Sequence, residues 1–535
     1  MKLGIIGASP FVLDALESWA VGEGLKVIEK SGLLVKVEAD LDTVEDALKI
    51  RLDRLEHGWH TTDQPTLPHG ALAVSGLSTT GKVYPHIRAH KLDHPMPPLV
   101  TNGPHPGLTP SQVNAAYSVT GSEDGTGYTM GIAEWGETFQ QSDIDLFCTD
   151  LQLPPATVQV VPIGGFVNTF NPQTALEATL DIQWGHAMAP GATLRVYMAP
   201  GGQDDVAWGL QVTTLLNAVL TDSVTPAVLS ISYGDGEDQF PATELAAWEH
   251  LIAAITAKGT VVCVSSGDQG AYGLHTFQQP QIPRVSGPSS CPSAVAVSAT
   301  ALFMTDLTLE DEWAWSNDAN LGATGGGYST VFARPSYQEG LNPQPTMRGV
   351  PDVSALGSVD TEGFMIIDGQ YATVAGTSLS TPIVAGILTR VTQAKGSLLG
   401  DIHTILYQQG SAICRDITVG NNNCFAVTGF ETQPGWDSVT GWGSPLYPQW
   451  LAIFGKGENP VTQPTVNPAT LTVAQLASAA DGAYGASNMS LQEAARVVQT
   501  ALQSANFFGL CHQPTGYFDS AQKAAFTLWT AGVRK

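Results

Sequence analysis

The sequence predicts an α/β fold: a doubly wound, mostly parallel sheet flanked by helices, with a small N-terminal α/β domain and a small C-terminal helical domain. Three observations support this prediction. The chain has 535 residues, enough for two to four domains. Short apolar or β-branched runs alternate with helical patterns from Leu108 to about Phe454. Proline-rich stretches separate this region from the residues on either side of it.

The prolines divide the chain into four predicted parts. Residues 1–98 form the small N-terminal domain, and residues 103–454 form the main domain. Residues 455–469 form a linker rich in proline, threonine, asparagine and glutamine, and residues 470–535 are mainly helical.

In the N-terminal domain, two apolar runs, Leu3–Ile6 and Leu33–Val37, predict strands. A partly periodic apolar stripe predicts a helix over Thr43–Leu55, capped by Asp42 or Thr43. We expect this domain to be either a shortened pro-domain, cleaved near Pro98–Leu108, or a permanent accessory domain.

The main domain contains five short runs that we expect to be parallel strands with helices between them. They are Val160–Ile163, Thr193–Met198, Ala227–Ser232, Thr260–Ser265 and Ala294–Ala299.

The composition argues against several classes of function. Lys and Arg total 23 against 49 Asp and Glu, a formal net charge of −26, so we expect no nucleic-acid partner, because phosphate binding needs basic patches. No apolar run reaches the length of about 18 residues that a membrane span needs, and the first residues lack a signal-peptide pattern. The acidic balance suits a protein that stays folded in acid, or one that is soluble in a neutral medium. The six cysteines contain no CxxC pair, which argues against zinc ribbons, and Cys414 and Cys424 either bridge or stay free.

The strongest local pattern is Gly376-Thr-Ser378-Leu-Ser-Thr-Pro382, followed by an apolar helical run. A serine just before a helix, preceded by Gly-Thr, has its hydroxyl at the positive end of the helix dipole. An ordinary Gly-Ser loop has the same letters, so the pattern needs a base to support it. No histidine has the surroundings of a catalytic base; we expect His186 to lie at the surface or at a helix end.

Two acids offer a base instead. Glu177 and Asp181 are four residues apart in a predicted helix, Thr174–Met188, so their carboxyl groups share one face. Their neighbours are mostly apolar, which favours a buried pair over a solvated helix face. Two carboxylates this close raise the pKa of one of them, so that the pair shares a proton in mild acid.

A third acid, Asp268, follows the predicted strand Thr260–Val264 in Ser266-Gly-Asp268-Gln-Gly270. Functional groups gather at the carboxyl ends of such strands. A protonated Asp268 would donate a hydrogen bond to a developing oxyanion; an Asx turn is the structural alternative.

Together these segments resemble the sedolisin family of serine-carboxyl peptidases, which have a subtilisin-like fold. The Glu177-x-x-x-Asp181 pair, the segment around Asp268 and the Gly-Thr-Ser378 segment match the three active-site motifs of the family in order. The resemblance covers roughly residues 103–452. It implies an endopeptidase that acts on polypeptides in acid.

The resemblance also implies a role for each residue. Ser378 is the nucleophile, Glu177 the general base, Asp181 the residue that orients Glu177 and shares its proton, and Asp268 the oxyanion donor. A carboxylate base with a pKa of ~4–5 works in acid, where Asp268 also keeps its proton.

Two further residues match positions that extend the acid network in some family members. They are Glu134 and Tyr233.

The family binds one structural Ca²⁺ near the end of its catalytic domain, and the matching positions here are Asp416, Ile417, Gln433, Gly435 and Asp437. Two carboxylates and the main-chain carbonyls of the other three residues provide the hard oxygen ligands that calcium prefers.

Residues 470–535 resemble a small peptidoglycan-binding helical domain, and a generic three-helix bundle is the alternative. Peptidoglycan as a partner implies an extracellular, cell-wall or virion location, although no signal peptide is present. We expect a monomer. The rival function is a non-catalytic structural or cell-wall-binding protein, for example of a phage, that retains a peptidase fold. An ordinary esterase is disfavoured because the chain has no Gly-x-Ser-x-Gly elbow at Ser378.

Overall fold

The computed structural model describes residues 1–91, 107–201, 207–276, 278–316, 321–341 and 345–455. The chain separates into two compact units, residues 1–457 and 458–535. The predicted helical domain at 470–535, and the predicted linker at 455–469 except for Gly455, lie outside the described residues.

A central sheet confirms the predicted fold class. Its strand order is β10-β11-β9-β12-β14-β16-β17, and β20 pairs with β16. All neighbours in it are parallel except β16 and β17, which form an antiparallel hairpin. The strands are β9 (Thr129–Trp135), β10 (Thr157–Pro162), β11 (Thr193–Ala199), β12 (Val228–Ile231), β14 (Val261–Ser265), β16 (Val295–Thr305), β17 (Thr308–Ala314) and β20 (Val353–Leu356). The five predicted strands are all present, each with slightly shifted ends.

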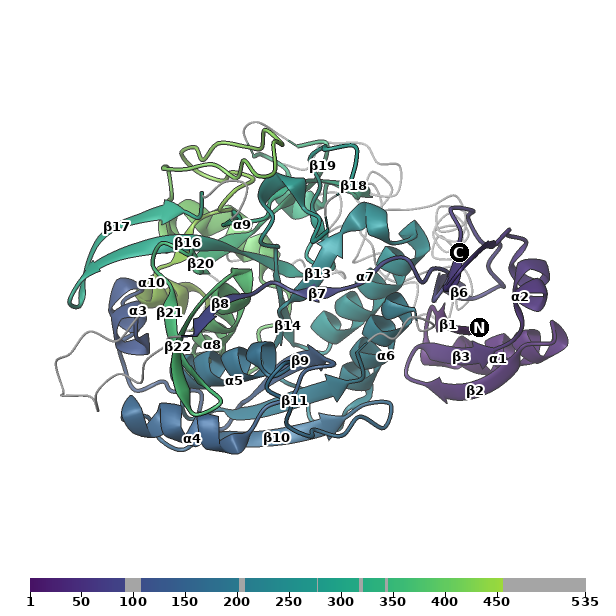
Figure 1. Ribbon diagram of the computed structural model, residues 1–535, viewed down its shortest axis with the longest axis horizontal. Coiled ribbons are helices and arrows are strands. Elements are labelled where there is room, and N and C mark those ends of the chain that lie inside the picture. The colour runs from purple at the N-terminus through teal and green to yellow at the C-terminus, as the bar shows by residue number, and fades with distance from the viewer. Residues whose placement is uncertain (92–106, 202–206, 277, 317–320, 342–344, 456–535) are drawn as a thin grey trace, which may run out of the picture. The chain divides into compact units, whose positions relative to one another are not determined.

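Helices cover both faces of this sheet (Figure 1). Side chains of α5 and α8, such as Leu180 and Ile383, pack in one core on one face. Side chains of α6 and α7, such as Leu216 and Leu251, pack in a second core on the other face. The helices of the main body are α3 (Pro110–Ala116), α4 (Gln141–Asp150), α5 (Leu176–Met188), α6 (Trp208–Thr221), α7 (Ala242–Ala257), α8 (Thr377–Lys395), α9 (His403–Ile413) and α10 (Tyr447–Trp450). Its smaller strands are β13 (Tyr233–Gly236), β15 (Ser286–Gly287), β18 (Gly327–Ala333), β19 (Met347–Val350), β21 (Gly363–Ile367), β22 (Gln370–Ala375), β23 (Cys414–Arg415) and β24 (Ser444–Pro445).

The N-terminal residues form an antiparallel four-stranded sheet in the order β2-β3-β1-β6, with two helices and a small hairpin. The elements are β1 (Lys2–Gly7), α1 (Leu13–Gly22), β2 (Lys26–Ser31), β3 (Leu34–Glu38), α2 (Leu41–Leu48), β4 (Asp53–Leu55), β5 (Gly58–His60) and β6 (Ala71–Ser75).

The predicted helix over Thr43–Leu55 is wrong at both ends. Helix α2 begins two residues earlier, because the Asp40 side chain, rather than Asp42 or Thr43, caps it by accepting from Thr43 N. It ends at Leu48 because Lys49 adopts a left-handed conformation, with φ of 56°. Leu55 therefore lies in strand β4.

The N-terminal sheet packs against α6 and α7 of the main body. Val74 N donates to Thr243 Oγ1 at 2.9 Å, and Ser75 Oγ donates to Glu244 Oε1 at 2.6 Å. Burial raises the pKa of Glu244 to about 7. The chain then continues into two strands, β7 (Tyr84–Pro85) and β8 (Arg88–Lys91), which pair with strands of the main body. Figure 1 shows them, in the colours of the N-terminus, among the teal and green elements.

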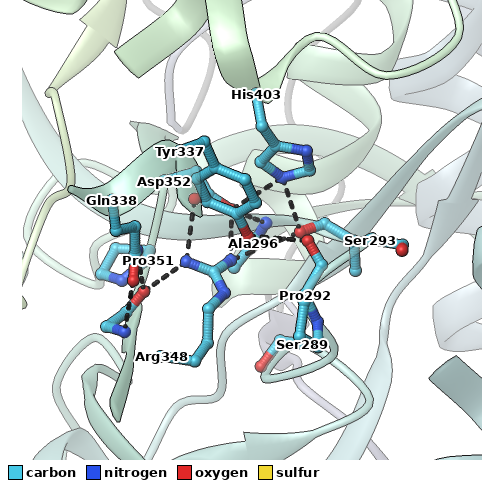
Figure 2. A network of polar contacts seen from close by, with 12 residues as sticks. Ser289, Pro292, Ser293, Ala296, Tyr337, Gln338, Arg348, Pro351, Asp352 and His403 are labelled. Carbon is cyan, nitrogen blue, oxygen red and sulfur yellow. Dashed lines mark hydrogen bonds and ion pairs between the residues drawn. The ribbon is translucent and has the colours of Figure 1, made fainter. Parts of the chain in front are cut away.

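A buried polar network joins β19, the residue Asp352 that precedes β20, and α9 (Figure 2). Arg348 donates to Asp352 from both terminal nitrogens, at 3.0 and 2.6 Å. Tyr407 OH donates to the same carboxylate at 2.7 Å, and the His403 ring lies 3.6 Å from it. Gln338 donates to Gly349 O at 2.8 Å. Because Arg348 and Asp352 are fully buried, this network fixes the segment between β19 and β20.

Cys414 is a buried free thiol, so no bridge joins it to Cys424. None of the helices in the described part of the chain has the length and apolar composition that crossing a membrane requires.

Candidate active site

Helix α5 carries two acids into the interior. Every residue from Glu177 to Met188 is buried, so no side of this part of the helix faces solvent. Glu177 and Asp181 are both 0% exposed. The predicted buried pair is therefore present, one helical turn apart on α5.

Neighbouring strands add further polar groups to this pair. Ser232, just after β12, donates to both Asp181 oxygens, at 3.0 and 2.9 Å. Glu134, near the end of β9, accepts from Tyr233 OH at 2.8 Å. Strands β9 and β12 are adjacent in the sheet, so their carboxyl ends deliver these side chains to one place.

The electrostatics of the cluster favour proton sharing. Burial, followed by the charges of Asp181 and Glu134, raises the pKa of Glu177 well above its ordinary value. Burial also raises the pKa of Asp181, against the hydrogen bonds from Ser232. Burial and the Asp181 charge raise the pKa of Glu134, against the bond from Tyr233. Several carboxyl groups here cannot all ionise together, so they hold protons in mild acid.

Ser378 is the second residue of α8, and Gly376 caps that helix with φ of 123°, a conformation that favours glycine. The Ser378 hydroxyl donates to Ser232 O at 3.2 Å. It also lies close enough to Glu177 to offset part of the rise in the pKa of that carboxyl. Neither Glu177 oxygen accepts a hydrogen bond of ordinary geometry from a described residue. A small rotation of the hydroxyl would turn its proton toward Glu177.

Asp268 lies at the carboxyl end of β14 and faces the start of α8. Its Oδ1 accepts from Thr377 N at 2.8 Å and from Thr377 Oγ1 at 3.0 Å. These two bonds fix the carboxyl group beside Gly376: a Cβ placed on that glycine would meet Asp268 Oδ2 at 2.8 Å. The carboxyl group is thus held beside the N-terminus of α8.

The structure brings all four predicted catalytic residues together, with Glu134 and Tyr233 next to them. Three further residues take part that no sequence pattern predicted: Ser232, Thr377 and Glu137. Ser232 directly precedes Tyr233, and Thr377 directly precedes Ser378. This adjacency to a predicted residue is the signal that the sequence offered. Burial raises the pKa of Glu137 to about 7, and its charge adds to the rise at Glu177; nothing in the sequence around Glu137 indicates this.

Two histidines need to be placed. His186 lies in the last turn of α5, as expected, but it is buried and not at the surface, with Nε2 2.7 Å from Pro154 O. His86, in the segment between β7 and β8, contacts Ser378 through its main chain: Ser378 N donates to His86 O at 3.0 Å. Its ring nitrogen Nδ1 lies 2.7 Å from Ser265 Oγ. His86 therefore contacts Ser378 through its main chain, as a bound peptide would. Its ring contacts Ser265 and is not placed as a base for Ser378.

The predicted calcium ligands lie in the loop 433–437 and at Asp416 and Ile417, and hydrogen bonds connect the two segments. Asp416 Oδ2 accepts from Gly435 N at 2.9 Å, and Asp437 Oδ2 accepts from Gln433 N at 3.0 Å. Burial raises the pKa of Asp437 to about 6, which a bound cation would reverse. No three His, Cys, Asp or Glu side chains gather as a metal group in the part of the chain that is described. A site here would therefore use two carboxylates and main-chain carbonyls, a donor set that fits Ca²⁺.

Comparison with known proteins gives the same assignment. The profile of the Subtilase family matches residues 173–443. Kumamolisin from Bacillus sp. (strain MN-32) is 31% identical over 386 residues, which cover 70% of this chain and 68% of that protein. The chain belongs to the sedolisin family. Tripeptidyl-peptidase 1 from Homo sapiens is 30% identical over 392 residues, covering 66% of this chain and 65% of the relative.

Among solved structures, Pseudomonas sedolisin, a serine-carboxyl proteinase complexed with two molecules of pseudo-iodotyrostatin, superposes with a TM-score of 0.61. It is 27% identical, and the match covers 66% of this chain and all 100% of that one. As a member of the sedolisin family, the chain is a serine peptidase, and its substrate is a polypeptide.

Proposed function

We propose that this sedolisin-family chain is an acid-acting endopeptidase whose nucleophile is Ser378. Glu177 takes the hydroxyl proton as Ser378 attacks the peptide carbonyl, and later returns it to the leaving amine. Asp181 orients Glu177 and shares its proton, while Asp268 and Ser378 N donate to the oxyanion. Water then attacks the acyl-enzyme, with Glu177 again as the base.

One observation supports this proposal most strongly: a buried, proton-sharing carboxylate pair lies beside a serine at a helix N-terminus. Such a pair is a base in mild acid, where an ordinary imidazole would be protonated. Burial and the charges of Asp181 and Glu134 keep the pKa of Glu177 high, and burial does the same for Asp181.

The test is cleavage of a denatured, unstructured protein from pH 3 to 7 by the wild type and by Ser378→Ala. We expect cleavage in acid that is lost in the variant by at least about 10³-fold. Glu177→Gln should lose a similar amount, because a neutral amide cannot accept the proton. Equal traces for wild type and Ser378→Ala would instead favour a non-catalytic protein that retains the peptidase fold.

We propose further that Asp416, Asp437 and the carbonyls of Ile417, Gln433 and Gly435 hold one Ca²⁺. The ion would tie the loop before Asp437 to the strand end at Asp416 and stabilise the domain. Removal of calcium by a chelator should lower the melting temperature of the wild type by several degrees and leave Asp437→Asn unchanged. An equal change in both proteins would rule the site out.

For residues 470–535 we propose binding to peptidoglycan, which would place the enzyme outside a cell, at a cell wall or on a virion. The proposal is supported by the sequence pattern alone. Sedimentation with purified insoluble peptidoglycan tests it: the full chain should co-sediment, and a chain ending at Gly455 should stay in solution. A monomer is expected in light scattering for both.

A further inference from the structure

Residues 84–91 lie beside the nucleophile as an extended peptide would. Tyr84 pairs with Gly234 in the antiparallel pairing of β7 with β13 (Figure 1). Two residues further on, His86 O accepts from Ser378 N at 3.0 Å. A polypeptide substrate added to the same strand edge would place its attacked carbonyl at the position of His86 O. The side chain two residues before that carbonyl would then lie where the Tyr84 side chain lies.

The ring of a histidine from the main body covers one face of Tyr84. The rings of Tyr84 and His275 are stacked, with centroids 4.2 Å apart and planes 6° from parallel. Tyr84 is partly buried, whereas His275 is exposed. Stacked aromatic rings attract each other beyond the area that they bury. His275 therefore offers a stacking surface for an aromatic side chain at this position of a bound peptide.

The main body, and not the segment 84–91, holds His275 in place. His275 N donates to Asp235 Oδ1 at 3.0 Å, and the same oxygen accepts from Gly236 N at 2.9 Å. Burial raises the pKa of Asp235 to about 7, so in mild acid this carboxyl group is neutral, and its carbonyl oxygen still accepts. We expect the His275 ring to keep its place when a substrate displaces residues 84–91.

The loop around His275 is fixed on both sides of the histidine. Before it, Leu274 is buried, with 1% of its surface exposed. After it, Thr276 O accepts from the Tyr272 hydroxyl at 3.1 Å, and the same hydroxyl accepts from Gln278 N. Tyr272 is itself buried. An exposed ring on a loop with buried anchors has a defined position, as a group that selects a substrate side chain requires.

From this geometry we infer that His275 is a specificity-determining residue: it selects substrates with an aromatic side chain two residues before the residue whose carbonyl Ser378 attacks. The inference rests on the proposed peptidase function and adds a substrate preference to it. An aliphatic side chain at this position would bury area against the histidine ring but lose the attraction between stacked rings. Asp235 is a positioning residue, because it acts through the main chain of His275.

The preference is tested first by digesting a denatured, unstructured protein with the full chain in mild acid and identifying the cut bonds by mass spectrometry. We expect tyrosine, phenylalanine and tryptophan at this position in at least about three times their share of the protein sequence. A share equal to that in the sequence would overturn the inference.

Peptide kinetics tests whether the preference depends on His275. The residues around one observed cut are copied into two fluorogenic peptides, with tyrosine or leucine at this position. In the wild type we expect kcat/KM for tyrosine to exceed that for leucine by about three- to ten-fold. His275→Ala should bring this ratio close to one, and His275→Phe should keep it, because phenylalanine restores a stacking surface. Gln278→Ala, which changes an exposed side chain of the same loop, is the matched control and should leave the ratio unchanged.

A second pair of variants tests how His275 is held. Asp235→Asn keeps an oxygen that accepts from His275 N, so it should keep the preference for tyrosine. Asp235→Ala removes that oxygen and should reduce the ratio to within about two-fold of one. A preference that survives in Asp235→Ala would overturn the positioning role of Asp235.

The outcomes separate the two proposals. If the wild type fails to cut a denatured protein at any pH, the peptidase function is wrong, and the inference falls with it. If it cuts that protein without an excess of aromatic residues at this position, or if His275→Ala keeps the preference for tyrosine, only the inference about His275 is wrong.

Discussion

At the scale of single residues, the two bonds from Thr377 decide which oxygen of Asp268 faces the substrate. They hold Oδ1, so Oδ2 is the oxygen beside the His86 carbonyl, and it donates only when it carries a proton. Asp268→Asn would keep the acceptor for Thr377 and present an N–H at every pH. We expect this variant to keep activity in acid within about ten-fold and to lose it at a pH at least about one unit higher than the wild type.

The measurement is kcat/KM from pH 3 to 8 for both proteins. Asp268→Ala is the control, and the missing donor should lower kcat by about 10²–10³ at all pH values. A pH limit that does not move in Asp268→Asn would show that ionisation of Asp268 does not set it.

The predicted site residues were found in two ways: Glu177 and Asp181 from their spacing on one helix, and Asp268 and Ser378 from short motifs that match a family. The four-residue spacing of Glu177 and Asp181 places them on one helix face in any fold. The contact between Ser232 and Asp181 instead depends on the position of α5 over β12, and the position of His86 depends on the pairing of β7 with β13. Such contacts join residues far apart in sequence, and no local pattern encodes them.

At the scale of elements, the buried network in Figure 2 holds the connection between β19 and β20. Burial opposes ionisation of Asp352, but the Arg348 charge and the contact with His403 outweigh it and hold its pKa far below the ordinary value. The carboxylate therefore stays charged in acid. Burial likewise lowers the pKa of His403, but Asp352 and Asp401 raise it to about 10 overall.

We therefore predict that Arg348→Met destabilises the fold by about 3–5 kcal/mol, because it leaves the Asp352 charge buried with its main partner removed. Denaturant unfolding at pH 5 measures this. Lys26→Met, which breaks an exposed pair with Glu38, is the control and should cost at most about 1 kcal/mol. Equal small losses in both variants would contradict the prediction.

The same network predicts how stability depends on pH. A histidine whose pKa is raised in the folded state contributes its full stabilisation below its unfolded value of 6.5. That contribution falls as the pH rises toward about 10. The free energy of unfolding should thus decline from pH 6.5 to 10 more steeply in the wild type than in His403→Gln. Parallel declines in the two proteins would argue against a charged His403.

At the scale of the whole chain, the sequence predicted the layout of the sheet but not the path of the segment after the N-terminal domain. Alternating strands and helices determine a doubly wound sheet almost independently of side-chain detail. Tyr84–Lys91 has no strong pattern of its own, and its strands exist because β13 and β22 offer open edges on either side of Ser378.

This arrangement predicts that acid weakens the binding of residues 84–91 to the main body. His86 has an ordinary pKa of 6.5, lowered to about 3 in its pocket by burial and His275. Because the pKa of His86 is lowered in the bound state, His86 stabilises that state fully above pH 6.5. This stabilisation falls as the pH drops toward 3. The protonated imidazole prefers water, so the pocket releases it more readily in acid.

We predict that local opening of residues 84–91 increases roughly hundred-fold between pH 7 and pH 4.5. Hydrogen exchange on the full-length Ser378→Ala chain, which cannot cut itself, measures this after correction for the intrinsic exchange rate. Ser378→Ala combined with His86→Gln is the matched control, because glutamine fills the pocket without titrating, and its opening should be nearly constant over that range. The same pH dependence in both chains would show that His86 does not control the release, and that any loosening comes from the carboxylates around Glu177 instead.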